Sequence, residues 1–145
     1  MGLWTGRKNL FYDGTDACLD TTNPEIPEYD CEMLFHMKKG KKLFVVGIVT
    51  CGRRNKLLRL FQALQKQYDS PIDVLVNENG SHELSTNDFR SFVRLRIIVF
   101  RQQEANIPKA RNTLLHAAKR RAKWIVFIDD DCMPIDGWAD TITKF

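Results

Sequence analysis

The sequence predicts an α/β fold, a mainly parallel sheet with helices on both faces. Four short apolar runs rich in Val and Ile are typical of strands buried on both faces: residues 43–49, 72–76, 96–100 and 124–128. The segments between them have the length of helical crossovers, which join parallel strands. A chain of 145 residues that is 43% hydrophobic is long enough for one domain with a core.

The strand over 43–49 is followed by a predicted helix, because apolar residues recur there at helical spacing: Leu57, Leu60, Phe61, Leu64 and Tyr68. Pro71 lies just beyond the end of this helix. After the strand over 72–76, the letters NENGS are a turn signal. Residues 82–95 are ambiguous, with a short helix expected around Asp88–Phe92.

The strand over 96–100 leads into a predicted helix over 107–121. Pro108 lies in its first turn and basic residues lie at its end, both favourable positions. The last strand then stops at three adjacent aspartates, Asp129–Asp131, and residues 136–145 look like the start of another helix.

Charge divides the chain into two parts. Residues 1–37 have a net charge of −5 and residues 38–145 a net charge of +9. We therefore expect an irregular acidic extension over 1–40 and a folded body over 41–145 whose basic excess favours an anionic partner. No apolar run approaches the roughly 20 residues of a membrane span. The four cysteines form no CxxC pair, which favours free thiols in a reducing cytoplasm.

Polar residues follow each predicted strand. In an open parallel sheet, ligands bind beyond the carboxyl ends of the strands, where the strand order reverses. The candidates after the first three strands are Thr50–Arg53, Asn77–Ser81 and Arg101–Asn106. The competing explanation is that loops are polar wherever they occur.

The three aspartates are the sharpest signal. On extended backbone, Asp129 and Asp131 point to the same side, and two carboxylates about 4 Å apart repel by about 4 kcal/mol at a partly desolvated site. Mg²⁺ or Mn²⁺ would offset that repulsion, with water and phosphate oxygens completing its shell. A solvated acidic turn and a helix N-terminus are the alternatives.

Other anion-binding motifs are missing from the sequence. There is no GxxxxGK[ST], and no GxGxxG follows the first strand. The basic helix over 108–121 lacks the interleaved aromatics that stack on bases, so a nucleic-acid partner is not expected.

Three segments together resemble the donor-binding half of family 2 glycosyltransferases with the GT-A fold, bacterial exopolysaccharide sugar transferases in particular. They are VGIVTCGRRNKLLRLFQAL, DVLVNENGS and ANIPKARNTLLHAAKRRAKWIVFIDDDCMPIDGW. The resemblance covers residues 43–145 and implies a Rossmann-like fold that binds a nucleotide-diphospho-sugar. It also implies a truncated C-terminus, with the acceptor half and the catalytic base expected beyond Phe145.

The resemblance implies a role for each matching position. Asp129 and Asp131 would bind Mn²⁺ or Mg²⁺ as metal ligands. The implied donor-binding residues are Thr50, Arg53, Glu78, Asn79, Arg111, Asp129 and Asp130. The implied donor is UDP- or GDP-linked. The sugar would pass with inversion to a hydroxyl acceptor, such as a lipid-linked glycan, in polysaccharide or glycan synthesis.

Each role has a simpler rival. Thr50 can merely end a strand, Asn79 and Gly80 form a common turn pair, and Arg111 can be an exposed helix charge.

Two other functions stay open. A sugar-nucleotidyltransferase would carry a Gly-rich basic loop after the first strand, and TCGRRN is a poor version of it. A non-catalytic polyanion-binding module could use Lys38–Lys42 and the basic residues of 119–123. The expected location is the cytoplasm, and the family is compatible with peripheral association at the inner face of the membrane.

Overall fold

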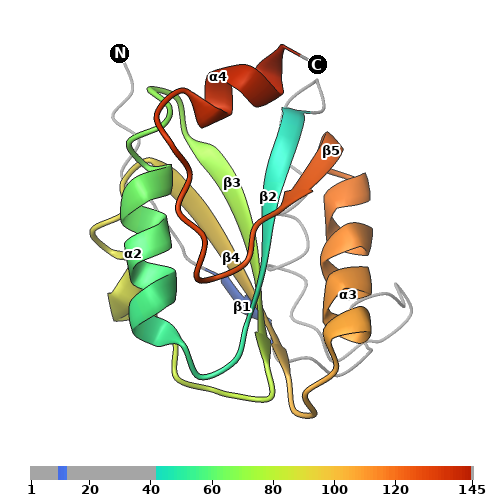
Figure 1. The fold of residues 1–145 in the computed structure, drawn as a ribbon. Helices are drawn as coiled ribbons and strands as arrows, with labels where there is room; N and C mark the ends of the chain where they lie inside the picture. The colour runs from blue at the N-terminus through green and yellow to red at the C-terminus, as the bar shows by residue number, and fades with distance from the viewer. Residues whose placement is uncertain (1–9, 13–41, 145) are drawn as a thin grey trace, which may run out of the picture.

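A computed structural model describes residues 10–12 and 42–144 of the chain (Figure 1). Five strands form one parallel sheet in the order β1-β4-β3-β2-β5. They are β1 (Leu10–Tyr12), β2 (Lys42–Thr50), β3 (Ile72–Asn79), β4 (Leu95–Gln102) and β5 (Ala122–Phe127). The predicted α/β class with a parallel sheet is confirmed.

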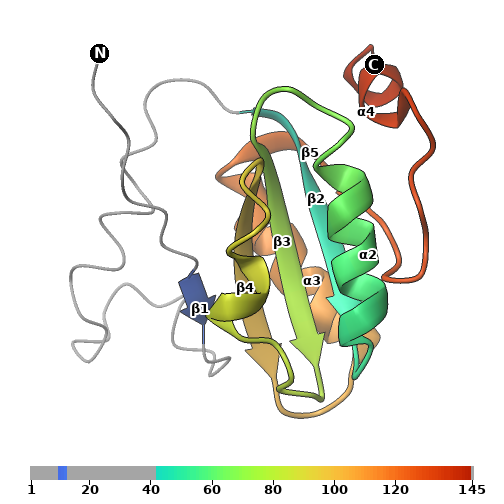
Figure 2. The same ribbon diagram turned by 90° about the vertical axis from the view of Figure 1, so that its left-hand side faces the viewer.

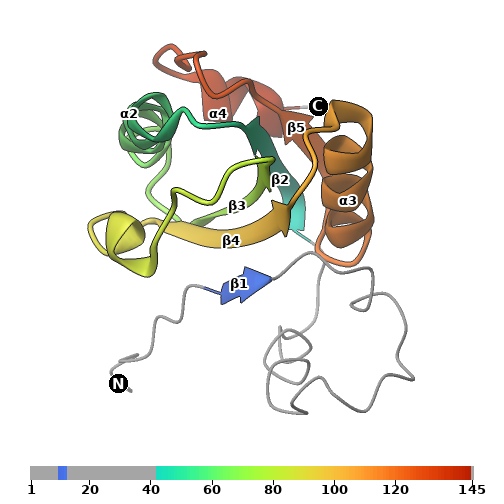
Figure 3. The ribbon, with the colours of Figure 1, turned by 90° about the horizontal axis from the view of Figure 1, so that it is seen from below.

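Helices cover both faces of this sheet, as predicted. They are α2 (Arg54–Leu64), the 3₁₀ helix η2 (Thr86–Phe89), α3 (Ile107–Lys119) and α4 (Trp138–Thr143). Seen from below, α2 and α4 lie on one side of the sheet and α3 lies on the other (Figure 3). The sheet therefore has one apolar core on each face.

The larger core lies between the sheet and α2. The four residues that α2 buries there are all among those at helical spacing in the sequence: Leu57, Leu60, Phe61 and Leu64. The smaller core lies under α3 and includes Val45, Leu75 and Leu114. Burial of these apolar faces against the sheet is the main stabilising term for the fold.

Two expectations about the strands were wrong. Polar residues 77–79 continue β3 instead of beginning a turn, because β2 and β4 pair with this strand on both sides. The last strand was expected to be covered on both faces, yet Trp124 is 60% exposed and Phe127 is 37% exposed. The reason is that β5 lies at the edge of the sheet, with β2 as its one strand neighbour among the described residues.

Other differences are smaller. The expected helix around Asp88–Phe92 is the 3₁₀ helix η2, which lies slightly earlier, at Thr86–Phe89. Helix α3 ends at Lys119 rather than at residue 121. Residues 10–12 pair with β4 within the predicted extension, and the rest of the extension lies outside the described residues.

The sheet order reverses between β2 and β5. From β2 the chain adds β3 and β4 on one side, and it then returns to place β5 on the other side of β2. The carboxyl ends of the strands all lie at the same end of the domain, at the bottom of Figure 2, whereas α4 lies at the opposite end. The carboxyl ends of β2 and β5 are therefore the place where this fold class binds ligands.

Candidate functional site

Asp130 ties the end of β5 to the end of β2. Its Oδ2 accepts a hydrogen bond of 2.7 Å from the hydroxyl of Thr50, the last residue of β2. Its Oδ1 accepts one of 3.1 Å from Nη1 of Arg53. Asp130 is only 4% exposed, so a buried carboxylate has both oxygens engaged within the protein. Its predicted contact with a donor stays a prediction.

Asp129 and Asp131 are exposed, but they do not share one side as expected. The backbone N–H of Cys132 donates to the carbonyl of Asp129 (3.0 Å), so the chain turns here instead of staying extended. Asp129 pairs with Arg111 on α3 (3.5 Å), while Asp131 faces Arg53 and Lys56 at the start of α2 (3.3 and 3.8 Å). The alternation of side chains that applies to a strand does not survive this turn.

Three basic side chains therefore surround the aspartates. Arg53 directly precedes α2, and Lys56 lies in the first turn of that helix. Arg111 comes from the first half of α3. The hydrogen bond and charge of Asp130, followed by the charge of Asp131, raise the pKa of Arg53. Arg111 also lies over the ring of Phe127, 5.8 Å from its centre, which helps to hold its guanidinium beside Asp129.

Asn79 lies at the next carboxyl end, but its side chain is buried and its oxygen is occupied. The Oδ1 accepts hydrogen bonds from Nε2 of Gln102 (3.0 Å) and from the backbone of Asn106 (2.7 Å). Asn106 in turn caps α3 by accepting from the backbone of Lys109 (2.9 Å). Asn79 thus positions the start of the helix that carries Arg111, a role that sequence reasoning missed.

Glu78 is not brought together with the other predicted residues. Its buried carboxylate accepts a hydrogen bond from the backbone of Leu84 (2.8 Å) and pairs with Nε of Arg101 (3.1 Å). Arg101 also donates to the carbonyl of Leu84 (2.8 Å). This network holds the loop after β3, and the predicted contact of Glu78 with a nucleotide stays a prediction.

Gly80 allows the loops after β3 and β4 to approach each other. It has a φ of +79°, and a Cβ there would lie 3.1 Å from the backbone nitrogen of Ala105. Its neighbour Ser81 accepts a hydrogen bond from the backbone of Gly52 in the loop after β2 (3.0 Å). The three loops that follow β2, β3 and β4 are therefore linked into one edge.

The exposed aspartates fit a hard divalent cation that keeps much of its own water. The described residues contain no group of three or more His, Cys, Asp or Glu side chains placed to hold a metal ion. Asp129 and Asp131, with side chains 70% and 46% exposed, are the two solvent-accessible carboxylates of the turn, and each is paired with a basic side chain. Mg²⁺ and Mn²⁺ suit such donors, because they bind through as few as one or two carboxylates and fill their other positions with phosphate oxygens and water.

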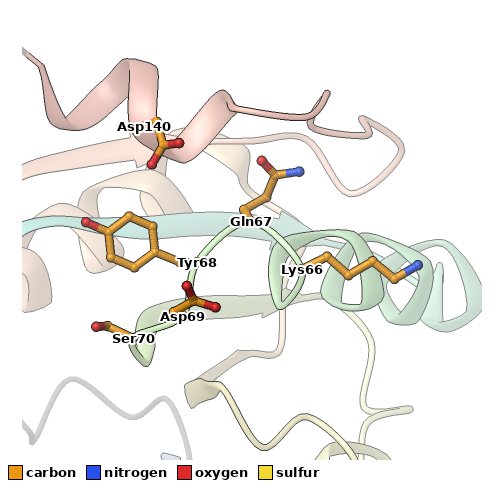
Figure 4. A pocket seen from close by; sticks show the side chains of 6 residues that line it. All are labelled: Lys66, Gln67, Tyr68, Asp69, Ser70 and Asp140. Atoms are coloured by element: carbon orange, nitrogen blue, oxygen red, sulfur yellow. The ribbon is translucent and has the colours of Figure 1, made fainter.

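A separate cavity of about 290 Å³ lies at the other end of the domain. It is lined by residues after α2 and by Asp140 of α4, as Figure 4 shows. Trp138 also lies at this end, where its ring packs edge-on against Phe44 at 6.2 Å. Trp138 therefore packs against the larger core, away from the aspartate turn.

Comparison with protein families decides the identity of the domain. The family model described as glycosyl transferase family 2 matches residues 45–144. The chain belongs to this family. The match includes all the predicted site residues, and it favours a glycosyltransferase over the two alternatives that the sequence left open. As a member of glycosyl transferase family 2, the chain is related to enzymes that use an activated sugar donor and an acceptor.

Two other comparisons add no relative, since no curated protein and no solved structure matches the chain. Among the residues that the structure describes, no helix is long and apolar enough to cross a membrane.

Proposed function

We propose that the chain binds a nucleotide-diphosphate sugar at the carboxyl ends of β2 and β5, with a divalent cation held by Asp129 and Asp131. The observation that carries the proposal is the aspartate turn at the reversal of strand order, surrounded by Arg53, Lys56 and Arg111. Carboxylates can hold the metal that a diphosphate binds, basic side chains can hold the phosphates directly, and both occur together here.

The chain's own residues would divide the work of donor binding. Arg111 and Lys56 lie on opposite sides of the turn, so their charges can meet a diphosphate from two directions. Thr50 and Asp130 hold the ends of β2 and β5 together and keep the turn in place. When bound, Mn²⁺ or Mg²⁺ would supply Lewis-acid stabilisation of the leaving diphosphate.

The proposed reaction transfers the sugar with inversion to a hydroxyl acceptor in polysaccharide or glycan synthesis, with UDP or GDP as the leaving group. Family membership supports the donor and acceptor classes in general. The basic groups around the turn support a strongly anionic leaving group.

Calorimetric titration of the purified chain with UDP and with GDP, with and without Mn²⁺, tests this proposal. We expect binding of one nucleotide to require Mn²⁺ and to weaken by about a hundredfold in Asp131→Ala, which loses a metal ligand. Asp140→Ala is the matched control, because it removes an exposed carboxylate at the opposite end of the domain.

Binding that ignores both Mn²⁺ and Asp131 would disprove the metal assignment. If neither nucleotide binds to a chain that melts cooperatively, the donor-binding proposal itself is wrong for this chain.

A further inference from the structure

The aspartate turn is already balanced by positive charge from the chain itself. Nη1 of Arg53 lies 3.1 Å from Asp130 Oδ1 and 3.3 Å from Asp131 Oδ2. Lys56 approaches the same oxygen of Asp131 at 3.8 Å. With Arg111 beside Asp129, three carboxylates meet three basic groups. A divalent cation that approaches this turn therefore encounters little net negative charge.

We propose that Arg53 is an internal counter-ion that competes with the divalent cation for Asp131 and thereby makes metal binding depend on the diphosphate. This inference rests on the proposed donor site. It assigns to Arg53 a positioning role that is distinct from simple contact with the donor.

The contacts of Arg53 suit such an exchange. Its bond to Asp130 is anchored, because that carboxylate is buried and is also held by Thr50. Its contact with Asp131 is longer, and the two side chains are 52% and 46% exposed. Ion pairs this exposed are weak and break readily. Arg53 can therefore release Asp131 while Asp130 keeps its guanidinium at the edge of the site.

A diphosphate gives the released guanidinium a new partner. Arginine binds phosphate through paired hydrogen bonds, which take the place of the ion pair with Asp131. Without the diphosphate, the cation must displace Arg53 from Asp131 and leave it with Asp130 alone. With the diphosphate, the cation and Arg53 each have an anionic partner. The two ligands should then strengthen each other's binding by the same factor.

Mn²⁺ titrations followed by electron paramagnetic resonance test this role directly, because they count free Mn²⁺ and need no enzymatic activity. The wild-type chain and Arg53→Gln are compared without nucleotide and with saturating UDP or GDP. Without nucleotide, we expect Arg53→Gln to bind Mn²⁺ about two- to fivefold more tightly than the wild type, because an exposed ion pair is worth at most about 1 kcal/mol. The nucleotide should then tighten Mn²⁺ binding less in the variant than in the wild type.

Three further variants separate the role of Arg53 from general effects of charge and folding. Arg59→Gln removes one exposed positive charge about one turn further along α2 than Lys56 and should leave Mn²⁺ affinity almost unchanged. Arg53→Lys keeps the charge and should bind Mn²⁺ like the wild type. Lys56→Gln should also raise the Mn²⁺ affinity, but by less than Arg53→Gln does. It provides a second test of the inference if Arg53→Gln does not fold.

Equal Mn²⁺ affinity in the wild type, Arg53→Gln and Lys56→Gln would overturn the inference, as would an equal gain in Arg59→Gln. The proposed function is judged separately, by whether UDP or GDP binds. Nucleotide binding with unchanged Mn²⁺ affinity in the variants would retain the function and reject the counter-ion. A gain in Mn²⁺ affinity without any nucleotide binding would keep Arg53 as the counter-ion of Asp131 and would reject both the proposed function and the dependence on the diphosphate.

Discussion

At each end of the sheet one aspartate is buried among basic side chains, yet the two sites are built differently. At the carboxyl end, both oxygens of Asp130 are engaged, and exposed carboxylates flank it in the sequence. At the amino end, Oδ1 of Asp73 pairs with both Lys42 (2.8 Å) and Arg96 (2.6 Å). The other oxygen of Asp73 has no hydrogen-bond partner among the described residues.

The difference teaches which feature marks a site. A buried aspartate with basic neighbours occurs at both ends, so by itself it indicates only a charge held in place. The carboxyl end adds two exposed carboxylates, each paired with a basic side chain, at the point where strand order reverses. Accessible charge, rather than buried charge, distinguishes the candidate site at the carboxyl end from the ion pairs of Asp73 at the amino end.

The largest expected effect concerns Asp73. Burial raises its pKa from 3.8 to about 6, and the charge of Arg121 acts in the opposite direction. At a pH between these two pKa values, the Asp73 carboxyl is mostly protonated in the folded state and mostly deprotonated in the unfolded state. Stability from this group is therefore complete below about pH 4 and lost as pH rises through 6, by up to about 3 kcal/mol. Urea unfolding of the wild type and Asp73→Asn from pH 4 to 7 measures it.

The variant should lack this part of the pH dependence, whatever its absolute stability. Asp69→Asn, which removes a fully exposed carboxylate nearby, is the control and should keep the wild-type slope. Parallel curves for the wild type and Asp73→Asn would show that Asp73 does not carry this pH dependence.

A second test removes the buried aspartate at the other end. Asp130→Ala should lower the free energy of unfolding by about 2 kcal/mol, because the Thr50 hydroxyl and the Arg53 guanidinium lose their shared partner. Asp130→Asn keeps an oxygen for Thr50 and should lose less. Urea unfolding followed by tryptophan fluorescence measures both, and equal stability of the alanine variant would mean that Asp130 is not a structural tie.

The smallest effect compares two glycines at the two ends. Gly80 and Gly137 both have positive φ, at +79° and +77°, so alanine is strained at either position. A Cβ at Gly80 would crowd the backbone of Ala105, whereas one at Gly137 meets nothing within 4 Å. We expect Gly80→Ala to cost about 1 kcal/mol more than Gly137→Ala in thermal or urea unfolding. Equal losses would show that the loops at the carboxyl end tolerate the added methyl.

The sequence predicted much of the fold because apolar periodicity is a local property. The helix that buries Leu57, Leu60 and Leu64 follows from their spacing alone. The extension of β3 to Asn79 does not, because polar residues in a central strand depend on partners on both sides. The exposure of Trp124 likewise depends on β5 being an edge strand, which no local pattern indicates.

The sequence alone also placed polar residues at the carboxyl ends of the strands, which is where the aspartates and their basic neighbours lie. Only the tertiary structure decided which aspartate is buried and which are exposed, because a turn after Asp129 replaces the expected extended backbone. Only the tertiary structure could show that Arg53 meets Asp130 and Asp131. These residues are 77 and 78 positions apart in the chain, and contacts at that separation arise from strand order, which no short motif contains.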